Sequence, residues 1–118
     1  MQILIAEDEA IIAESLYQVL LELGHQPLEP ADNFAEAIEV LQTASPGLAI
    51  VDIHIGEHFS GFKVAAALNK TNTPFIFLTA LYDKETIDRA KEFNPAAYLV
   101  KPFNKENLFA TIELAANQ

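Results

Sequence analysis

The chain has 118 residues, which suits one domain and is short for two domains of ordinary size. About half of the residues are apolar (51%) and none is cysteine, so we expect a packed core and exclude disulfides and thiolate zinc sites. The net charge is −10, from 17 acidic and 7 basic residues, whereas contacts to nucleic-acid phosphates need a basic surface. These numbers predict one domain over residues 1–118 that does not bind nucleic acid directly.

The first residues, Met1 to Asp8, reach acidic side chains before a long apolar stretch develops, and they lack the basic segment that opens a signal peptide. No apolar run in the sequence approaches the roughly 18 residues of a membrane-spanning helix. We therefore expect a cytoplasmic protein without a membrane partner.

Four short runs consist almost entirely of apolar residues, which is typical of strands buried on both faces of a parallel sheet. These runs are residues 3–6, 48–51, 75–78 and 97–100. A weaker run at residues 25–31 is broken by Pro27 and Pro30. It predicts an edge strand, where a missing N–H is tolerated.

The segments between these runs carry apolar residues at the spacing of one helix face. The five stripes are Ile12, Leu16, Val19, Leu20 and Leu23; Phe34, Ala37, Ile38 and Leu41; Phe62, Ala65, Ala66 and Asn69; Ile87 and Ala90; and Leu108, Ile112 and Ala115. Strands and helices thus alternate five times, which predicts right-handed crossovers and helices on both faces of the sheet. The fold expected is a doubly wound α/β fold of the flavodoxin-like (βα)5 type, with strand order 2-1-3-4-5.

Residues typical of helix ends flank several of these stripes. Gly24 is a natural stop after the first. Asn33, Asp83 and Asn104 are placed to cap the second, fourth and fifth helices, with Glu36 as the N3 partner of Asn33.

Polar side chains follow four of the five predicted strands, at the edge of the sheet where ligands of open α/β folds bind. They are Glu7, Asp8 and Glu9 after the first strand, Asp52 after the third, Thr79 after the fourth and Lys101 after the fifth. Any one of them has a simpler explanation, since polar residues commonly follow a buried strand without taking part in a site. Acid, hydroxyl and amine arriving at one edge together indicate a functional site.

The chemistry of these groups favours phosphoryl transfer. Crowded carboxylates repel one another, so a cation is expected among them, and oxygen ligands without a calcium loop favour Mg²⁺. Lys101 can bind a phosphate oxygen as a point charge and Thr79 can donate a hydrogen bond, while one carboxylate acts as nucleophile. There is no Walker A loop or G-x-G-x-x-G, so a nucleotide is not the obvious donor. The histidines at positions 25, 54 and 58 are too scattered to predict a metal site.

Four segments together resemble a known family over essentially the whole chain. They are Ile3-Leu4-Ile5-Ala6-Glu7-Asp8-Glu9, Leu48-Ala49-Ile50-Val51-Asp52-Ile53, Phe77-Leu78-Thr79-Ala80 and Tyr98-Leu99-Val100-Lys101-Pro102-Phe103. In this order and spacing they resemble the response-regulator receiver domain of bacterial two-component systems. The resemblance implies a phospho-accepting switch that receives its phosphoryl group from a sensor histidine kinase or a phosphotransfer protein. It implies no enzyme activity other than the domain's own phosphoryl transfer and slow dephosphorylation.

The resemblance also assigns roles around the acceptor. Asp52 is the implied phospho-acceptor, and Asp8 and Asp52 are implied to bind Mg²⁺ directly. Glu7 is implied to act on the metal through water, and the backbone carbonyl of His54 to be the third protein ligand. The family more often has Asp at the position of Glu7, whose longer arm is expected to alter the water around the metal without abolishing binding.

Further positions are implied to carry the switch. Thr79 would bond the phosphoryl oxygen after transfer, Lys101 would pair with the phosphate, and the Lys101–Pro102 peptide would be cis. Tyr98 would swing inward as Thr79 moves. The output face would be built by the helix that carries Ile87, the last strand and the last helix, and a homodimer through this face is a further expectation.

Three questions stay open at this point. The segment 53–61 lacks the family's usual proline and is one residue longer, which makes the His54 carbonyl the least secure ligand. The alternative to a phosphorylated receiver is an interaction module of the same fold that works without phosphate. The complete set of acids, Thr79 and Lys101 favours the first. The chain is either a stand-alone regulator or the receiver of a longer protein with an output domain.

Overall fold

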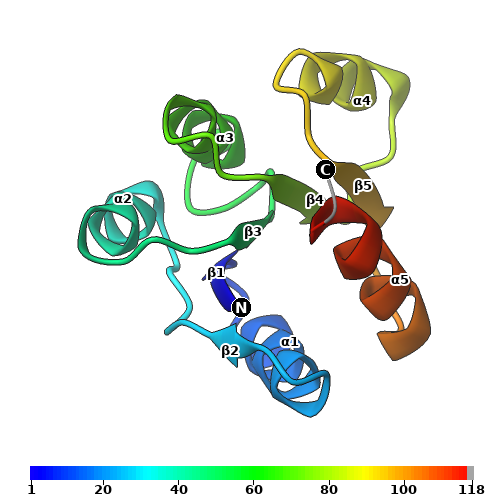
Figure 1. The fold of residues 1–118 in the computed structure, drawn as a ribbon. Helices are drawn as coiled ribbons and strands as arrows, with labels where there is room; N and C mark the ends of the chain where they lie inside the picture. Colours follow the sequence, from blue (N-terminus) through cyan, green and yellow to red (C-terminus); the bar gives the residue numbers. More distant parts are fainter. Residues whose placement is uncertain (117–118) are drawn as a thin grey trace.

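A computed structural model describes residues 1–116 of the chain, so the last two residues of the expected domain, 117 and 118, lie outside the described residues. Five strands alternate with five helices along the chain (Figure 1). In order they are β1 (Gln2–Ala6), α1 (Ala10–Glu22), β2 (Gln26–Pro27), α2 (Phe34–Thr43), β3 (Leu48–Val51), α3 (Ser60–Lys70), β4 (Phe75–Thr79), α4 (Lys84–Lys91), β5 (Ala97–Val100) and α5 (Lys105–Ala116). Within residues 1–116, no helix is both long enough and apolar enough to span a membrane.

The strands form one parallel sheet in the order β2-β1-β3-β4-β5, which confirms the predicted fold class and strand order. The central strands β1, β3 and β4 are almost wholly buried, as the apolar runs predicted. The edge strand β2 is shorter than the predicted segment, because regular pairing stops at Pro27 and resumes as a single bridge between Ala31 and Ala6. A proline lacks the N–H that would continue the ladder.

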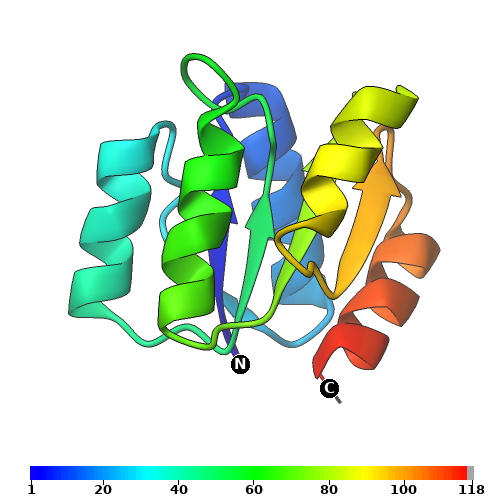
Figure 2. The same cartoon turned by 90° about the horizontal axis from the view of Figure 1, so that it is seen from above.

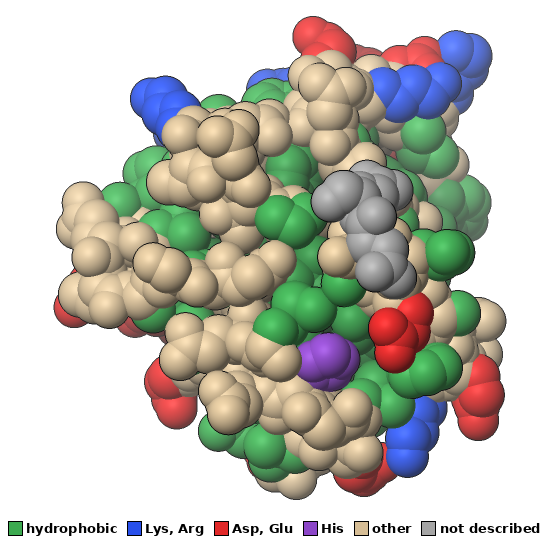
Figure 3. All heavy atoms as spheres, in the orientation of Figure 1, with side chains coloured by type: hydrophobic (Ala, Val, Ile, Leu, Met, Phe, Trp, Pro, Cys, Tyr) green, Lys and Arg blue, Asp and Glu red, His purple; other side chains and the backbone are tan. Residues whose placement is uncertain are grey.

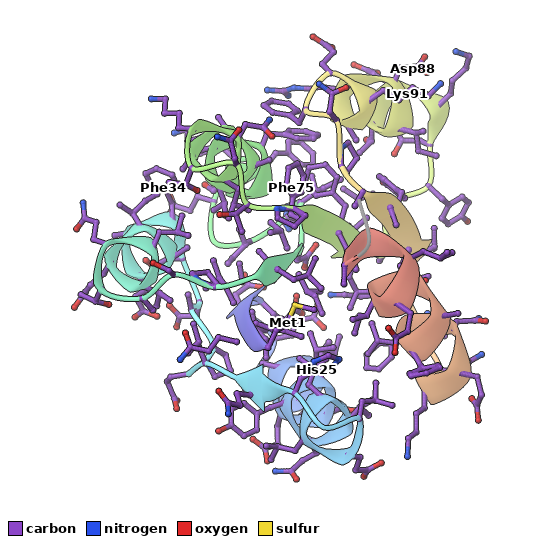
Figure 4. The ribbon with its side chains drawn as sticks, in the orientation of Figure 1. Met1, His25, Phe34, Phe75, Asp88 and Lys91 are labelled. Atoms are coloured by element: carbon purple, nitrogen blue, oxygen red, sulfur yellow. The ribbon has the colours of Figure 1, made fainter. Side chains whose placement is uncertain are left out.

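Two apolar clusters hold helices on the two faces of the sheet. In Figure 1, α2, α3 and α4 lie on one face and α1 and α5 on the other. The first cluster joins the sheet to Ala37, Leu68 and Ala90 on α2, α3 and α4, and Phe75 points into it from β4 (Figure 4). The second cluster joins the sheet to α1 and α5, through residues such as Leu16 and Ile112. The sheet is thus covered on both sides, which leaves its two ends as the places where polar groups gather.

The predicted helix caps are confirmed. Asn33, Asp83 and Asn104 each accept a hydrogen bond from the backbone N–H three residues on, at distances of 2.9, 3.0 and 2.7 Å. Glu36 reaches back as expected of an N3 partner, although it accepts from the N–H of Asp32 (3.0 Å). These bonds satisfy N–H groups that the first turn of a helix leaves free.

The buried face predicted for α3 is wrong by about one position. Ala66 and Asn69 are exposed, whereas Val64 and Leu68 are buried beside Phe62 and Ala65. The helix begins at Ser60 with its backbone pressed against the end of β3, and this contact rotates the buried face away from Ala66. Asn69 instead donates a hydrogen bond to the Phe93 carbonyl oxygen (2.9 Å).

Candidate functional site

The predicted site residues lie together at the edge where the parallel strands end. The strands are all parallel, and Figure 2 shows β3 and β5 pointing toward this edge, which is opposite the chain termini. Side chains that are far apart in sequence line one cavity of about 330 Å³ there. The lining residues are Asp8, Glu9, Asp52, His54, Thr79, Ala80, Leu81 and Lys101. The structure therefore brings together the groups that the sequence placed on four separate strand ends.

The ammonium of Lys101 bridges two buried carboxylates. Its Nζ lies 2.8 Å and 3.1 Å from the two carboxylate oxygens of Glu7 and 3.1 Å from Asp52 Oδ2. The side chain of Lys101 is only 10% exposed, and Glu7 and Asp52 are 4% and 6% exposed. Breaking a buried ion pair leaves an uncompensated charge, so this arrangement fixes all three side chains in place.

The pKa of Glu7 is raised to about 8, chiefly by burial; the hydrogen bond to Lys101 lowers it, and the nearby Asp52 carboxylate raises it. Burial alone would lower the pKa of Lys101, but its hydrogen bonds and the charges of Glu7 and Asp52 outweigh burial and raise it. Glu7 and Asp52 thus share the ammonium of Lys101. In the metal-free protein, we expect Glu7 to keep its proton to a higher pH than an ordinary glutamic acid.

Three carboxylates form a group that suits a hard cation. One oxygen from each of Glu7, Asp8 and Asp52 lies within 4.8 Å of the others. Opposite oxygen ligands of Mg²⁺ are about 4.2 Å apart, twice its bond length of about 2.1 Å, so small side-chain movements would bring these oxygens into range. The all-oxygen donor set, two buried acids beside one exposed acid, fits a magnesium ion that keeps part of its water shell.

The loop after β3 holds two of these carboxylates by backbone N–H groups. The N–H of His54 donates to Asp52 Oδ1 (3.1 Å), and the N–H of Gly56 donates to Asp8 Oδ2 (3.0 Å). Between them, Ile55 is fully buried in the core. The sequence analysis missed these anchors, and its expectation that the His54 carbonyl binds metal stays a prediction.

Thr79 and Tyr98 both form hydrogen bonds with the backbone of Leu81. Thr79, the last residue of β4, is 1% exposed and accepts a hydrogen bond from the N–H of Leu81 (3.3 Å). The hydroxyl of Tyr98 donates to the Leu81 carbonyl oxygen (2.7 Å). Burial raises the pKa of Tyr98, with the charges of Asp83 and Asp52 acting in the same direction. The Lys101–Pro102 peptide, which follows β5, is cis.

Gly61 is a second residue that the sequence analysis missed. A Cβ at this position would collide with the Asp52 carbonyl oxygen and lie 2.5 Å from the Cα of Ile53. The first turn of α3 can therefore approach the end of β3 only because residue 61 has no side chain. A lone glycine near the start of a helix was the only available signal.

A family model described as "Response regulator receiver domain" matches residues 3–113. The chain belongs to this family. Receiver domains in general are signalling domains that work with histidine kinases or phosphotransfer proteins. The resemblance seen in the sequence is thereby confirmed.

Relatives and solved structures agree with this assignment. The receiver is similar to the transcriptional regulatory protein PdtaR of Mycobacterium tuberculosis (35% identity over 99% of this chain and 57% of that protein). It is also similar to the regulator PhyR of Methylorubrum extorquens (34% identity over 97% of this chain and 43% of that protein). The chain thus spans about half the length of the curated relatives it matches. The receiver domain of a modulated diguanylate cyclase from Desulfovibrio desulfuricans G20 has 38% identity, a TM-score of 0.90, and coverage of 98% of this chain and 93% of that chain.

Proposed function

We propose that this receiver is a phospho-accepting switch in which Asp52 takes a phosphoryl group from a sensor histidine kinase or a phosphotransfer protein. The observation that supports this most directly is the position of Lys101. Its ammonium lies 3.1 Å from Asp52 Oδ2, in a cavity that Thr79 also lines. A nucleophilic carboxylate, a fixed positive charge and a hydroxyl donor thus surround one space.

The transfer step exchanges one bond for another. A carboxylate oxygen of Asp52 forms a bond to phosphorus while the bond from phosphorus to an imidazole nitrogen of the donor breaks. That nitrogen keeps the bonding electron pair, and the donor ring leaves neutral when its other nitrogen carries a proton. Lys101 then pairs with a phosphoryl oxygen and Thr79 donates a hydrogen bond to another, which stabilises the charge on the transferred group.

Three carboxylates are the proposed Mg²⁺ site, with Asp8 and Asp52 as direct ligands, Glu7 acting through water and the His54 carbonyl as the remaining protein ligand. When bound, the ion would neutralise charge on the transferring phosphoryl oxygens. Gly56 holds one oxygen of Asp8 and leaves the other free, so the carboxylate is already oriented in the cavity. Lys101 holds Glu7 and Asp52 together in the metal-free protein.

A groove beside the acceptor supports a protein donor rather than a small molecule alone. It has a volume of about 560 Å³ and shares Lys101 and Glu9 with the acceptor cavity. Its apolar lining consists of Ile11, Ile12, Val19, Ala80, Pro102 and Phe103. Ile11 is 86% exposed at the start of α1, so a partner that covers it would gain apolar contact next to Asp52.

Relay to partners is proposed through the face formed by α4, β5 and α5. Thr79 and Tyr98 both contact Leu81, in the segment that joins β4 to α4. A phosphoryl group that draws the Thr79 hydroxyl toward Asp52 would change this contact and with it the preferred position of Tyr98. A homodimer through the same face belongs to this proposal.

The same proposal covers the remaining expectations for the chain. It places the receiver in the cytoplasm and treats residues 1–118 as one domain. Its only catalysis is its own phosphorylation and slow dephosphorylation, and it does not contact nucleic acid itself. Both architectures, stand-alone or joined to an output domain, are compatible with it.

The test is incubation with acetyl phosphate and Mg²⁺, followed by intact-mass measurement. The wild type is expected to gain one phosphoryl group, and Asp52→Ala is expected to gain none. Asp88→Ala is the matched control, because Asp88 is a partly exposed acid (45%) on α4, where Figure 4 shows it beside Lys91, and it pairs with Lys84 and Lys91. An unmodified wild type would leave the phosphate-independent interaction module as the better interpretation.

A further inference from the structure

The loop between β3 and α3 connects Asp52 to α4 by contacts in which neither Thr79 nor Tyr98 takes part. We propose that this loop, residues 54–59, is a second transmitting element of the receiver, in which the Phe59 ring couples the phosphorylation state of Asp52 to α4. This inference rests on the proposed function, because it requires Asp52 to exist in two states.

The acceptor end of the connection is a hydrogen bond. Asp52 Oδ2 is held by Lys101 and Oδ1 by the backbone N–H of His54, both at 3.1 Å. A hydrogen bond to an ionised carboxylate is roughly twice as strong as one to a neutral acceptor. Phosphorylation of either oxygen turns the carboxylate into a mixed anhydride and removes its charge from this bond. The position preferred by His54 therefore differs between the two states of Asp52.

The loop itself is held in a strained conformation. His58 and Phe59 both lie in the left-handed region, with φ of 52° and 55°. For residues with a side chain this costs about 1–2 kcal/mol each. Contacts at the start of α3 maintain the strain, since Gly61 donates to the Ile53 carbonyl oxygen (2.9 Å) and Phe62 to that of Phe59 (3.1 Å). Figure 2 shows the loop projecting beyond the sheet edge. Residues 56–59 of the loop are exposed, and a strained, exposed segment can shift at low cost when one anchor weakens.

A series of aromatic contacts leads from this loop to α4. The rings of His54 and Phe59 meet edge to face at 5.4 Å, and Phe59 lies 6.4 Å from Phe62. Phe62 is 4% exposed and stacks on Phe93, just after α4, at 5.1 Å. The guanidinium of Arg89, on α4, lies 4.6 Å from the centre of the same Phe62 ring. Movement of Phe59 therefore alters the packing on which α4 rests.

Phe59 is the weakest point of this connection and so the best place to interrupt it. It is 38% exposed, its backbone is strained, and among the described residues its ring contacts both the His54 ring and the Phe62 ring. Removing its ring leaves Asp52, Lys101 and Thr79 untouched. The acceptor should still be phosphorylated while the response of α4 is reduced.

The experiment compares backbone amide NMR shifts before and after addition of acetyl phosphate and Mg²⁺, within each variant. In the wild type, the amides of Arg89 and Phe93 should shift on phosphorylation. In Phe59→Ala the shift changes at these two amides should fall about twofold or more, with an unchanged phosphoryl mass. Leu21→Ala is the control, because Leu21 is similarly exposed (46%) on α1, outside the face formed by α4, β5 and α5, and is expected to keep the full response.

Different outcomes separate this inference from the proposed function. A full phosphoryl adduct with an undiminished response at Arg89 and Phe93 in Phe59→Ala would overturn this inference alone. A wild type without any adduct would overturn the proposed function and this inference with it. If the alanine variant does not fold, Phe59→Leu keeps the apolar volume without the ring. It is judged in the same way, by its phosphoryl mass and by the shift changes at Arg89 and Phe93.

Discussion

Two cavities of nearly equal size lie at opposite ends of the strands of the same sheet. The one where the strands end has about 330 Å³ and contains Asp52, Lys101 and further acids. The one where β3 and β4 begin has about 310 Å³, and the described residues that line it carry no charge. They are Leu41, Ala44, Ser45, Pro46, Gly47, Thr71, Asn72, Thr73 and Pro74. Figure 3 shows the edge where the strands begin, with most charged side chains at its periphery.

The two cavities differ in buried charge and not in volume, so buried charge distinguishes the candidate site. Desolvating Glu7, Asp52 and Lys101 costs free energy that apolar residues of the same size would not cost. The hydroxyls of Thr71 and Thr73 in the opposite cavity simply bond each other (2.8 Å). Stability alone therefore does not account for the charged cluster at the end of the sheet where Asp52 lies.

A large effect on stability is expected from removing the positive charge of Lys101 from the cavity that contains Asp52. In Lys101→Met, Glu7 and Asp52 would face each other without a partner. We expect the free energy of unfolding of the metal-free protein to fall by about 2 kcal/mol near pH 8, less than for a fully enclosed pair because the cavity admits water. Thr73→Ala, in the opposite cavity, should change it by less than about 0.5 kcal/mol. Urea denaturation in the presence of a chelator measures the free energy of unfolding of both variants. Equal losses in Lys101→Met and Thr73→Ala would refute the contrast between the two cavities.

A smaller effect is expected on metal binding. Asp8→Asn should weaken Mg²⁺ binding by at least about tenfold, since even outer partners of metal ligands contribute that much. Asp32→Asn, an exposed acid on the neighbouring loop before α2, should leave the affinity unchanged. Calorimetric titration with MgCl₂ measures both variants. Similar affinities in the two would show that the cluster of Glu7, Asp8 and Asp52 is not the metal site.

A further effect concerns pH. Because the pKa of Glu7 is raised to about 8 from 4.5, the folded metal-free protein holds a proton that the unfolded chain has released. The corresponding stability is fully present below pH 4.5 and is lost as pH rises through about 8. Between about pH 6 and pH 9, stability should therefore fall more in the wild type than in Glu7→Gln. Parallel curves from chemical denaturation at each pH would show that Glu7 does not carry this proton.

The strands and the site residues could be predicted from sequence because each depends on a local pattern. Buried parallel strands are apolar throughout, and residues directly after them must lie at one edge, so Asp52, Thr79 and Lys101 were placed without any contact information. Caps such as Asn33 and Asp83 are equally local, since donor and acceptor are three residues apart.

The loop after Asp52 could not be predicted in the same way. Its shape depends on Gly56 reaching Asp8, 48 residues away in sequence, and on Gly61 lying against the end of β3. Left-handed φ at His58 and Phe59 is contrary to local preference, so tertiary contacts decide it. The double ion pair of Lys101 also joins residues that only the folded sheet brings together.

The most direct test of the central claim is to locate the phosphoryl group by residue. Borohydride reduces an aspartyl phosphate to homoserine, so treatment of the phosphorylated protein followed by peptide mass spectrometry marks the acceptor. The account predicts homoserine at position 52 and intact aspartate at position 8. Homoserine at position 8, or a phosphoryl adduct that leaves Asp52 unmarked, would contradict it.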